Sequence, residues 1–199
     1  MRIVQQDGRR RRGDRSRAEI LDSVLRAAST DGLESITFGR IAGELGLSKG
    51  NLTVLFGDKT SLQLAAFDAA IARVIEYIVK PALAKRTPRA RLRALVDGWF
   101  DHMGDRLFPG GCFLFGTAHE FRARKGPVRD QVLLQMERWR GLFEREFAAA
   151  GAPDPKAAAF SVISYQNSAH LFLLLGDRAS FERARRGARR VIEHLGRTA

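Results

Sequence analysis

The sequence predicts an all-α protein, and three observations support that fold class. Apolar residues recur with the helical period, as they do at Ile20, Leu21, Val24, Leu25 and Ala28. Strand signals are almost absent, because no segment sustains an alternation of β-branched residues and no Asn-Gly or Asp-Gly hairpin joins two apolar runs. Glycine, proline and capping residues divide the helical patterns into segments of ordinary helix length. We therefore expect about nine helices.

Four of these helices are expected near the N-terminus, at residues 16–30, 38–45, 49–56 and 59–79. Pro81 is expected to stop the fourth, because proline lacks the backbone N–H and its ring clashes with the preceding turn. The residues that cap or separate the four helices are Asp31-Gly32, Thr37, Gly46, Ser48, Gly57 and Asp58. Five further helices are expected at residues 89–106, 113–123, 127–150, 155–176 and 179–195.

The charge of the chain indicates an acidic partner. Its 34 basic and 22 acidic residues give a net charge of +12 over 199 residues. Nucleic acid or an anionic surface is the first partner to expect. Residues 1–60 carry 11 basic and 8 acidic side chains, a net +3, so most of the excess lies further along the chain.

Several classes of protein are disfavoured by composition. The single cysteine, Cys112, excludes an internal disulfide, and four scattered histidines show no zinc-site spacing, so we expect no metal and a cytoplasmic location. No apolar region precedes the four arginines at residues 9–12, so a secretory signal is not expected. The charge-free stretch 157–176 has polar groups at its centre and is expected to be buried in protein, not in a membrane.

Cys112 has two alternative interpretations. It stands beside two glycines at an expected helix start, where a thiolate would be favoured, so a redox sensor is one reading. No second cysteine is present to pair with it, and a small buried apolar residue is the preferred reading.

The segment from Thr37 to Phe56 has the pattern of a helix-turn-helix. Two short helices are joined by a tight turn containing Gly46, and their apolar residues supply a minimal core. The outer face of the second helix is left with short side chains, and Gly50 lets its backbone approach a duplex closely. This geometry places the second helix in the major groove of DNA.

Side-chain chemistry suggests individual roles on that second helix. Ser48 and the helix N-terminus can donate hydrogen bonds to a phosphate, and Lys49 can neutralise one. Asn51 can hydrogen-bond an adenine edge, and Thr53 and Val54 can contact thymine methyl groups. The sequence does not decide between these roles.

Many residues between Arg17 and Leu64 match one known pattern in order: Ile20-Leu21, Ala27-Ala28, Gly32, Ile36-Thr37, Ile41-Ala42, Leu45 to Gly50, Phe56 and Asp58-Lys59. Through them the segment resembles the N-terminal domain of TetR-type (tetracycline-repressor-like) transcriptional regulators. The resemblance implies that Lys59 reaches the DNA backbone. Thr53 and Leu55 depart from the family, which usually has an aromatic residue and often a histidine there, so the phosphate contacts of those residues do not carry over.

The C-terminal part resembles one subgroup of the same family, through Phe-Pro-Gly-Gly-Cys-Phe at residues 108–113 and Gly-Pro-Val-Arg-Asp at 126–130. The resemblance implies a helix-turn-helix DNA-binding domain over residues 16–61 and a ligand-binding and dimerisation domain over 62–199. The expected function is that of a DNA-binding transcriptional regulator, a ligand-relieved repressor that binds a palindromic operator as a dimer. The effector itself is not identified.

Residues 1–15 are expected to form a basic flexible arm. Its arginines can follow the phosphate backbone or enter a minor groove, and the alternative is a solvated tail without a DNA role. The expected DNA-binding residues are Arg12, Arg15, Arg17, Thr37, Ser48, Lys49, Gly50, Asn51, Thr53, Val54 and Lys59.

Large apolar residues in the second domain can line an effector pocket. Such residues are individually more often core, but pockets between helices are mostly apolar with a few polar anchors. An apolar or aromatic molecule bound there would weaken DNA binding by changing the spacing of two recognition helices. The candidates are Trp99, Phe100, His102, Met103, Phe113, Phe121, Met136, Trp139, Phe143, Asn167 and His170, with His119 as a further possible anchor.

The last two expected helices combine an almost charge-free surface with a basic one. Paired with a second copy they would form a four-helix homodimer interface; the alternative is that they complete a monomer core. Two other classes compete with the regulator. A helical enzyme would need a catalytic motif, and none stands out, so we expect no enzymatic activity. A membrane-surface protein would need a continuous cationic amphipathic helix, whereas the basic residues lie in separate patches, so no membrane partner is expected.

Overall fold

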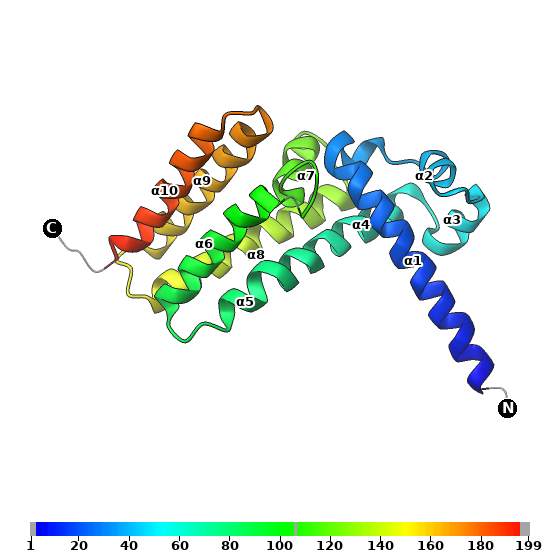
Figure 1. The fold of residues 1–199 in the computed structure, drawn as a ribbon, viewed down its shortest axis with the longest axis horizontal. Coiled ribbons are helices and arrows are strands. Elements are labelled where there is room, and N and C mark those ends of the chain that lie inside the picture. Colours follow the sequence, from blue (N-terminus) through cyan, green and yellow to red (C-terminus); the bar gives the residue numbers. More distant parts are fainter. Residues whose placement is uncertain (1–2, 106, 196–199) are drawn as a thin grey trace.

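The protein is described from a computed structural model that gives the backbone of residues 3–105 and 107–195 and the side chains of residues 17–103 and 107–195. Helix α1 (Ile3–Asp31) leads into a 3₁₀ turn, η1 (Leu33–Ser35), and then into α2 (Phe38–Leu45) and α3 (Lys49–Phe56). In Figure 1 these elements form one end of the molecule, and α1 extends past them.

The expected start of the first helix is wrong. The structure carries helical backbone from Ile3 to Asp31, so residues 3–15, which were expected to form an arm, continue α1 as helix. Arginine is among the better helix formers, and four consecutive arginines let the helix propagate past Gly8 and Gly13. The side chains of Arg12 and Arg15 lie outside the described residues.

Pro81 does not stop the fourth helix. Helix α4 (Lys59–Val74) passes into a π-helical segment, η2 (Ile75–Val79), and on through α5 (Lys80–Leu83). The Lys80 N–H bonds to the Ile75 carbonyl, five residues back. This wider turn just before Pro81 accommodates the proline. The backbone hydrogen bonds of the helix are already shifted to i→i−5 at that point, so the missing proline N–H interrupts the helix less.

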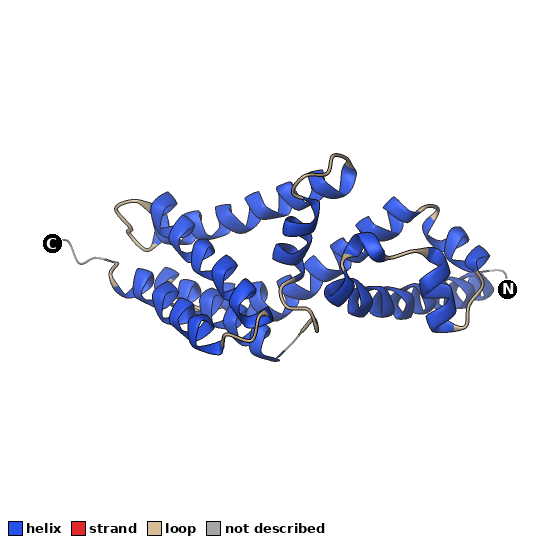
Figure 2. Cartoon of the chain, turned by 90° about the horizontal axis from the view of Figure 1, so that it is seen from above, coloured by secondary structure: helices blue, strands red, loops and turns tan. Residues whose placement is uncertain are grey.

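The second part of the molecule contains five more helices, α6 (Pro88–Asp105), α7 (Phe113–Phe121), α8 (Pro127–Ala149), α9 (Pro155–Leu174) and α10 (Arg178–Glu193). With α4, η2 and α5 counted as one continuous helix, the described chain has nine α-helices and no strand, which confirms the predicted fold class. Figure 2 shows the all-helical chain from above. Helices α9 and α10 pack side by side (Figure 1). Within the described chain, no helix combines the length and apolarity that crossing a membrane requires.

Two contacts join the end of α1 to the second part. The loop before α7 approaches α1 so closely that a Cβ on Gly110 would lie 1.5 Å from the Ser29 carbonyl oxygen. From α7, the Glu120 carboxylate accepts hydrogen bonds from the backbone N–H groups of Leu33 (2.8 Å) and Glu34 (2.9 Å). The second domain therefore holds the turn that leads into the helix-turn-helix.

Some of the basic residues of the second domain have structural roles. Arg185 pairs with Asp101 (2.6 Å) and Arg189 with Asp97 (2.7 Å), which fastens α10 to α6. The Arg89 guanidinium donates to backbone carbonyls at the C-terminal end of α10, a position where a cation also meets the negative end of the helix dipole. Part of the charge excess therefore stabilises the domain.

Candidate DNA-binding surface and the cavities behind it

Helices α2 and α3 form the helix-turn-helix that the sequence predicts, and their caps lie where expected. The Thr37 hydroxyl accepts from the Arg40 N–H (3.2 Å), and the Ser48 hydroxyl accepts from the Asn51 N–H (3.2 Å). Gly46 adopts a left-handed conformation with φ 65°, which glycine reaches without a Cβ penalty, and this reverses the chain between the helices. These caps and the turn at Gly46 define where α2 begins and ends and where α3 begins.

The outer face of α3 is exposed, and its inner face is buried. Leu52 is 0% and Phe56 is 6% exposed, whereas Val54, between them in sequence, is 86% exposed. The exposed side of α3 is therefore available to a partner outside the chain. The exposed residues of this surface are Ser48, Lys49, Gly50, Asn51, Thr53 and Val54, all of them predicted DNA-binding residues.

Thr53 and Thr37 have local roles in the free protein. The Thr53 hydroxyl donates to the Lys49 carbonyl within α3 (3.1 Å). Thr37 is exposed and uses its hydroxyl as the N-cap of α2, which leaves the start of that helix facing outward.

Two basic residues predicted to contact DNA are engaged within the protein. The Lys59 ammonium donates to the Glu34 carbonyl (2.7 Å) and to its carboxylate (3.0 Å). The Arg17 guanidinium donates to the Leu55 carbonyl (2.7 Å) and lies over the Phe56 ring. In this structure Arg17 fastens α1 to the end of α3, and Lys59 anchors α4 to η1.

The predicted pocket residues do not surround a single cavity. Trp99, Phe100 and Phe143 are buried in aromatic contacts, with the Trp99 and Phe100 rings 4.9 Å apart at their centroids. Trp139 is buried and donates its indole N–H to Gln166 (2.9 Å), a residue the sequence did not single out. Met103 is buried, as is His102. These six side chains belong to the packed core.

The other five predicted pocket residues line three separate cavities. Phe113 and His170 belong to a cavity of about 330 Å³ between the end of α1, the start of α7 and α9, which we call the interdomain cavity. Met136 and Asn167 line an open groove of about 310 Å³ between α7, α8 and α9, where Asn167 bonds His119 (2.9 Å). Phe121 lines a third hollow beside η1. The interdomain cavity and the hollow beside η1 both have walls from the two domains.

Two buried histidines are held neutral by their surroundings. Burial, with a smaller contribution from the charge of His170, lowers the pKa of His102 to about 4; burial, then the charge of His119, lowers that of His170 to about 4. Among the residues whose side chains are described, neither ring nitrogen of His102 has a hydrogen-bond partner, and nor does Nε2 of His170. Both side chains are under one-tenth exposed.

These histidines predict acid sensitivity. Unfolded, each has a pKa near ~6.5, so between pH 6.5 and 4 the unfolded chain binds protons that the folded chain does not. We expect the free energy of unfolding to fall across this range by on the order of 3 kcal/mol for each histidine. Urea unfolding at pH 7, 5.5 and 4.5 measures the fall, and His102→Leu should flatten it. Parallel pH profiles for this variant and the wild type would contradict the assignment.

Cys112 is not the activated thiol that its place at a helix start allowed. Its side chain is 4% exposed, and burial raises the pKa of the thiol above its usual value. The buried apolar reading is the one that this environment supports.

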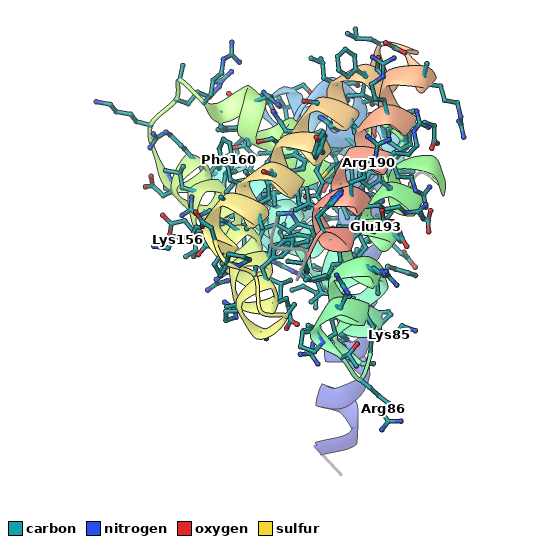
Figure 3. The ribbon with its side chains drawn as sticks, turned by 90° about the vertical axis from the view of Figure 1, so that its left-hand side faces the viewer. Lys85, Arg86, Lys156, Phe160, Arg190 and Glu193 are labelled. Atoms are coloured by element: carbon teal, nitrogen blue, oxygen red, sulfur yellow. The ribbon has the colours of Figure 1, made fainter. Side chains whose placement is uncertain are left out.

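Helix α9 and its C-terminal end carry an apolar stripe that the described residues leave uncovered. Phe160 is 70% exposed, Leu171 53% and Leu175 73%, and the helical period places them on one side of α9. Figure 3 shows Phe160 on the outside of the molecule, one turn from Lys156. Arg190 and Glu193, on α10, also face outward beside it.

Two carboxylates that hold η1 in place, those of Glu34 and Glu120, are not among the predicted site residues. Glu34 joins Lys59, Gln63 and Arg124 in one network, and hydrogen bonds from Gln63 and Lys59 lower the pKa of its carboxyl group. Glu120 binds η1 from a helix more than eighty residues away in sequence. Gly32 is the sequence feature that marks this contact. A Cβ at this position would lie 2.6 Å from a Glu120 oxygen, so the close approach of Glu120 needs a glycine. From the sequence alone, Gly32 indicates only the end of a helix.

The comparisons with known proteins agree with this architecture. The family model for the tetracyclin repressor-like C-terminal domain matches residues 88–188. The HTH-type transcriptional regulator BetI from Yersinia pestis (strain Pestoides F) is 31% identical over 87 residues, which are 43% of this chain and 44% of BetI. The match therefore spans less than half the length of that curated relative.

Two solved structures share the fold over almost the whole chain. A TetR transcriptional regulator from Chloroflexus aurantiacus superposes with a TM-score of 0.81 at 21% identity, covering 94% of this chain and 98% of that one. A transcriptional regulator from Saccharomonospora viridis in complex with choline gives 0.78 at 20% identity, covering 91% and 97%. Since the matched family domain covers half of the sequence, the chain belongs to the TetR (tetracycline-repressor-like) family of transcriptional regulators.

Proposed function

We propose that this protein is a DNA-binding transcriptional regulator that binds a palindromic operator as a homodimer and represses until a small effector binds. The observation that carries the proposal is the outer face of α3. Its side chains are short and open, and Val54 is 86% exposed on a helix whose other face is fully buried. A rigid helix presenting polar and small apolar groups outward matches the major groove of DNA.

Dimerisation follows from the limits of a single α3. One recognition helix reads too few bases for useful specificity, whereas two heads can bind half-sites about 34–36 Å apart. The uncovered apolar stripe of α9 and its neighbour α10 supply the surface for a second copy. Two such helix pairs would form a four-helix interface.

Effector control follows from the contacts between the two domains. The end of α1 and the turn η1 are held by the loop before α7 and by Glu120, so a molecule that moves α7 also moves the helix-turn-helix. The Saccharomonospora viridis regulator, which shares this fold, is in complex with choline, and this supports a small-molecule effector. The proposal includes a cytoplasmic location, because the DNA lies there. It includes no enzymatic activity.

A selection from random duplexes with the purified protein tests DNA binding directly. We expect it to return a palindromic site, because two identical heads read two inverted half-sites. Enrichment of no sequence, or of a single unrepeated half-site, would contradict dimeric readout.

Two variants then separate base readout from phosphate contact. Asn51→Ala should weaken binding to the selected site by about 1–3 kcal/mol while leaving binding to random DNA almost unchanged. Lys49→Ala should weaken both alike and reduce the salt dependence of binding, because a phosphate contact carries no sequence information. Fluorescence anisotropy on both duplexes at several salt concentrations measures these effects. If the two variants behaved identically, the assigned roles would be wrong.

A further inference from the structure

A basic segment of the second domain borders the helix-turn-helix. Residues 122–129, which we call the basic segment, run from the end of α7 into the first turn of α8 and contain Arg122, Arg124, Lys125 and Arg129 and no acidic side chain. The first three are exposed and Arg129 is half-buried. Among the described side chains, Lys125 and Arg129 have no ion-pair partner. Structural pairing therefore does not account for these two charges.

The basic segment reaches the elements on either side of α3. Arg124, Lys125 and Arg129 line the hollow beside η1, and Glu34 and Thr60 line it from the first domain. Glu34 belongs to η1, which leads into α2, and Thr60 lies in the first turn of α4, the helix that follows α3. The second domain therefore places cations beside the approach to α2 and beside the start of α4.

One carboxylate joins a cation of each domain. Oε1 of Glu34 lies 3.0 Å from the Lys59 ammonium and 3.6 Å from the Arg124 guanidinium, so these two cations are neighbours. The Arg124 side chain is still 48% exposed in this arrangement. Lys59 is a predicted contact of the DNA backbone, which the first helix of a helix-turn-helix crosses. A phosphate that displaces Glu34 from Lys59 would therefore also lie beside Arg124.

The charge of this surface fits a polyanion. Three cations and one carboxylate line the hollow as the described residues form it, and that carboxylate is already shared by Lys59 and Arg124. Positive charge is therefore left over at the edge of the proposed DNA-binding surface. Lysine can neutralise a phosphate as a point charge, and arginine can bind one through its planar fork.

We propose that the basic segment contacts the phosphate backbone of the operator, so that the second domain contributes directly to DNA affinity. Lys125 and Arg129 each neutralise a phosphate, and Arg124 exchanges its contact with Glu34 for another. Phosphate contacts carry no base information, so they strengthen binding to every sequence alike. The proposal rests on the proposed function and extends the DNA surface beyond the helix-turn-helix. It also assigns a role to part of the positive charge that lies beyond residue 60.

A salt titration of the full chain counts the phosphates that the basic segment neutralises. Lys125→Ala combined with Arg129→Ala removes two cations from each chain and four from a dimer. Each neutralised phosphate adds about 0.9 to the slope of log affinity against log salt, so we expect the slope to become less steep by ~2–4. At low salt the DNA affinity should fall at least ~10-fold, on the selected and the random duplex alike. An unchanged slope and affinity would overturn the proposal.

Lys85→Ala combined with Arg86→Ala is the control matched for charge. Both residues are exposed in the turn after α5, which Figure 1 places at the end of the molecule far from α2 and α3. Figure 3 shows both on the outside of the molecule. This variant loses the same charge as the basic-segment variant but should keep the slope and the affinity of the wild type. Equal losses in the two variants would mean that net charge acts at a distance, and would overturn the contact.

Phosphate ethylation interference on the selected duplex locates the contact. At least one phosphate should weaken binding of the wild type when it is ethylated and leave binding of the basic-segment variant unchanged. If both proteins showed the same interference pattern, direct contact would be refuted.

The same measurements separate failure of this inference from failure of the proposed function. If the wild type bound no duplex at all, the proposed function would fall, and the contact with it. If Lys49→Ala and Asn51→Ala behaved as expected while the basic-segment variant matched the wild type, the proposed function would stand and only the second-domain contact would be refuted.

Discussion

Replacement of Gly110 by alanine should destabilise the protein by about 3 kcal/mol, a large effect for one methyl group. The added Cβ would lie 1.5 Å from the Ser29 carbonyl oxygen and 2.3 Å from its carbon, both backbone atoms of α1. Backbone cannot rotate aside as a side chain does, so the loop before α7 must withdraw from α1. The hydrogen bond from the Gly110 N–H to the Ser29 hydroxyl (3.3 Å) would be lost with it.

Urea unfolding of Gly110→Ala measures this cost, and Gly43→Ala is its matched control. Gly43 lies inside α2, where a Cβ would meet nothing within 4 Å. The same substitution there should stabilise the protein by about 0.5–1 kcal/mol, because alanine is the better helix former. If the free energy of unfolding falls in Gly110→Ala and rises in Gly43→Ala, the close approach of the backbone at Gly110, and not the change from glycine to alanine as such, causes the loss of stability. A Gly110→Ala protein as stable as the wild type would refute the interdomain contact.

The helix-turn-helix could be predicted residue by residue because its signals are local. Thr37 and Ser48 each bond an N–H three residues ahead, and the left-handed turn at Gly46 needs only the absence of a Cβ. The exposure of Val54 also follows from its position in the helical period, opposite Leu52 and Phe56. Such features depend on a few consecutive residues, which a sequence displays directly.

The start of α1 and the passage through Pro81 depend on competing local preferences. Arginine favours helix while Gly8 and Gly13 oppose it, and the sequence does not show which effect is larger. At Pro81 the chain keeps a helical direction by forming a π-helical segment from Ile75 to Val79. Proline usually ends a helix, so reasoning from the sequence predicts a helix end here and not a π-helical segment.

The site residues that could not be predicted are fixed by tertiary contacts. Lys59 is basic and lies at the start of a helix near the expected DNA surface, yet Glu34 binds it at 3.0 Å. Glu120 has no signal in its own neighbourhood, since its partners are backbone N–H groups of a distant turn. Among large apolar residues, Trp99 and Phe113 look alike in sequence, but only packing distinguishes a core ring from a cavity wall.

The second large effect is expected at α9. Phe160→Glu combined with Leu171→Glu should convert the dimer to a monomer and reduce affinity for the two-half-site duplex by about 100-fold or more. The two side chains are 70% and 53% exposed and stand eleven residues apart, three helical turns along one face. In the monomer each introduced carboxylate would be exposed to solvent, whereas in the dimer it would be buried in an apolar contact. The substitutions should therefore weaken association without destabilising the monomer.

Analytical ultracentrifugation and anisotropy on one-half-site and two-half-site duplexes would separate the two consequences. The variant should keep wild-type affinity for a single half-site, because α3 is untouched, and should lose the gain that comes from linking two heads. Tyr77→Glu, at an aromatic residue of η2 that is 67% exposed, is the control and should remain dimeric. If the α9 variant stayed dimeric, the interface would lie elsewhere; if Tyr77→Glu also became monomeric, the dimer would depend on net charge and not on the apolar stripe.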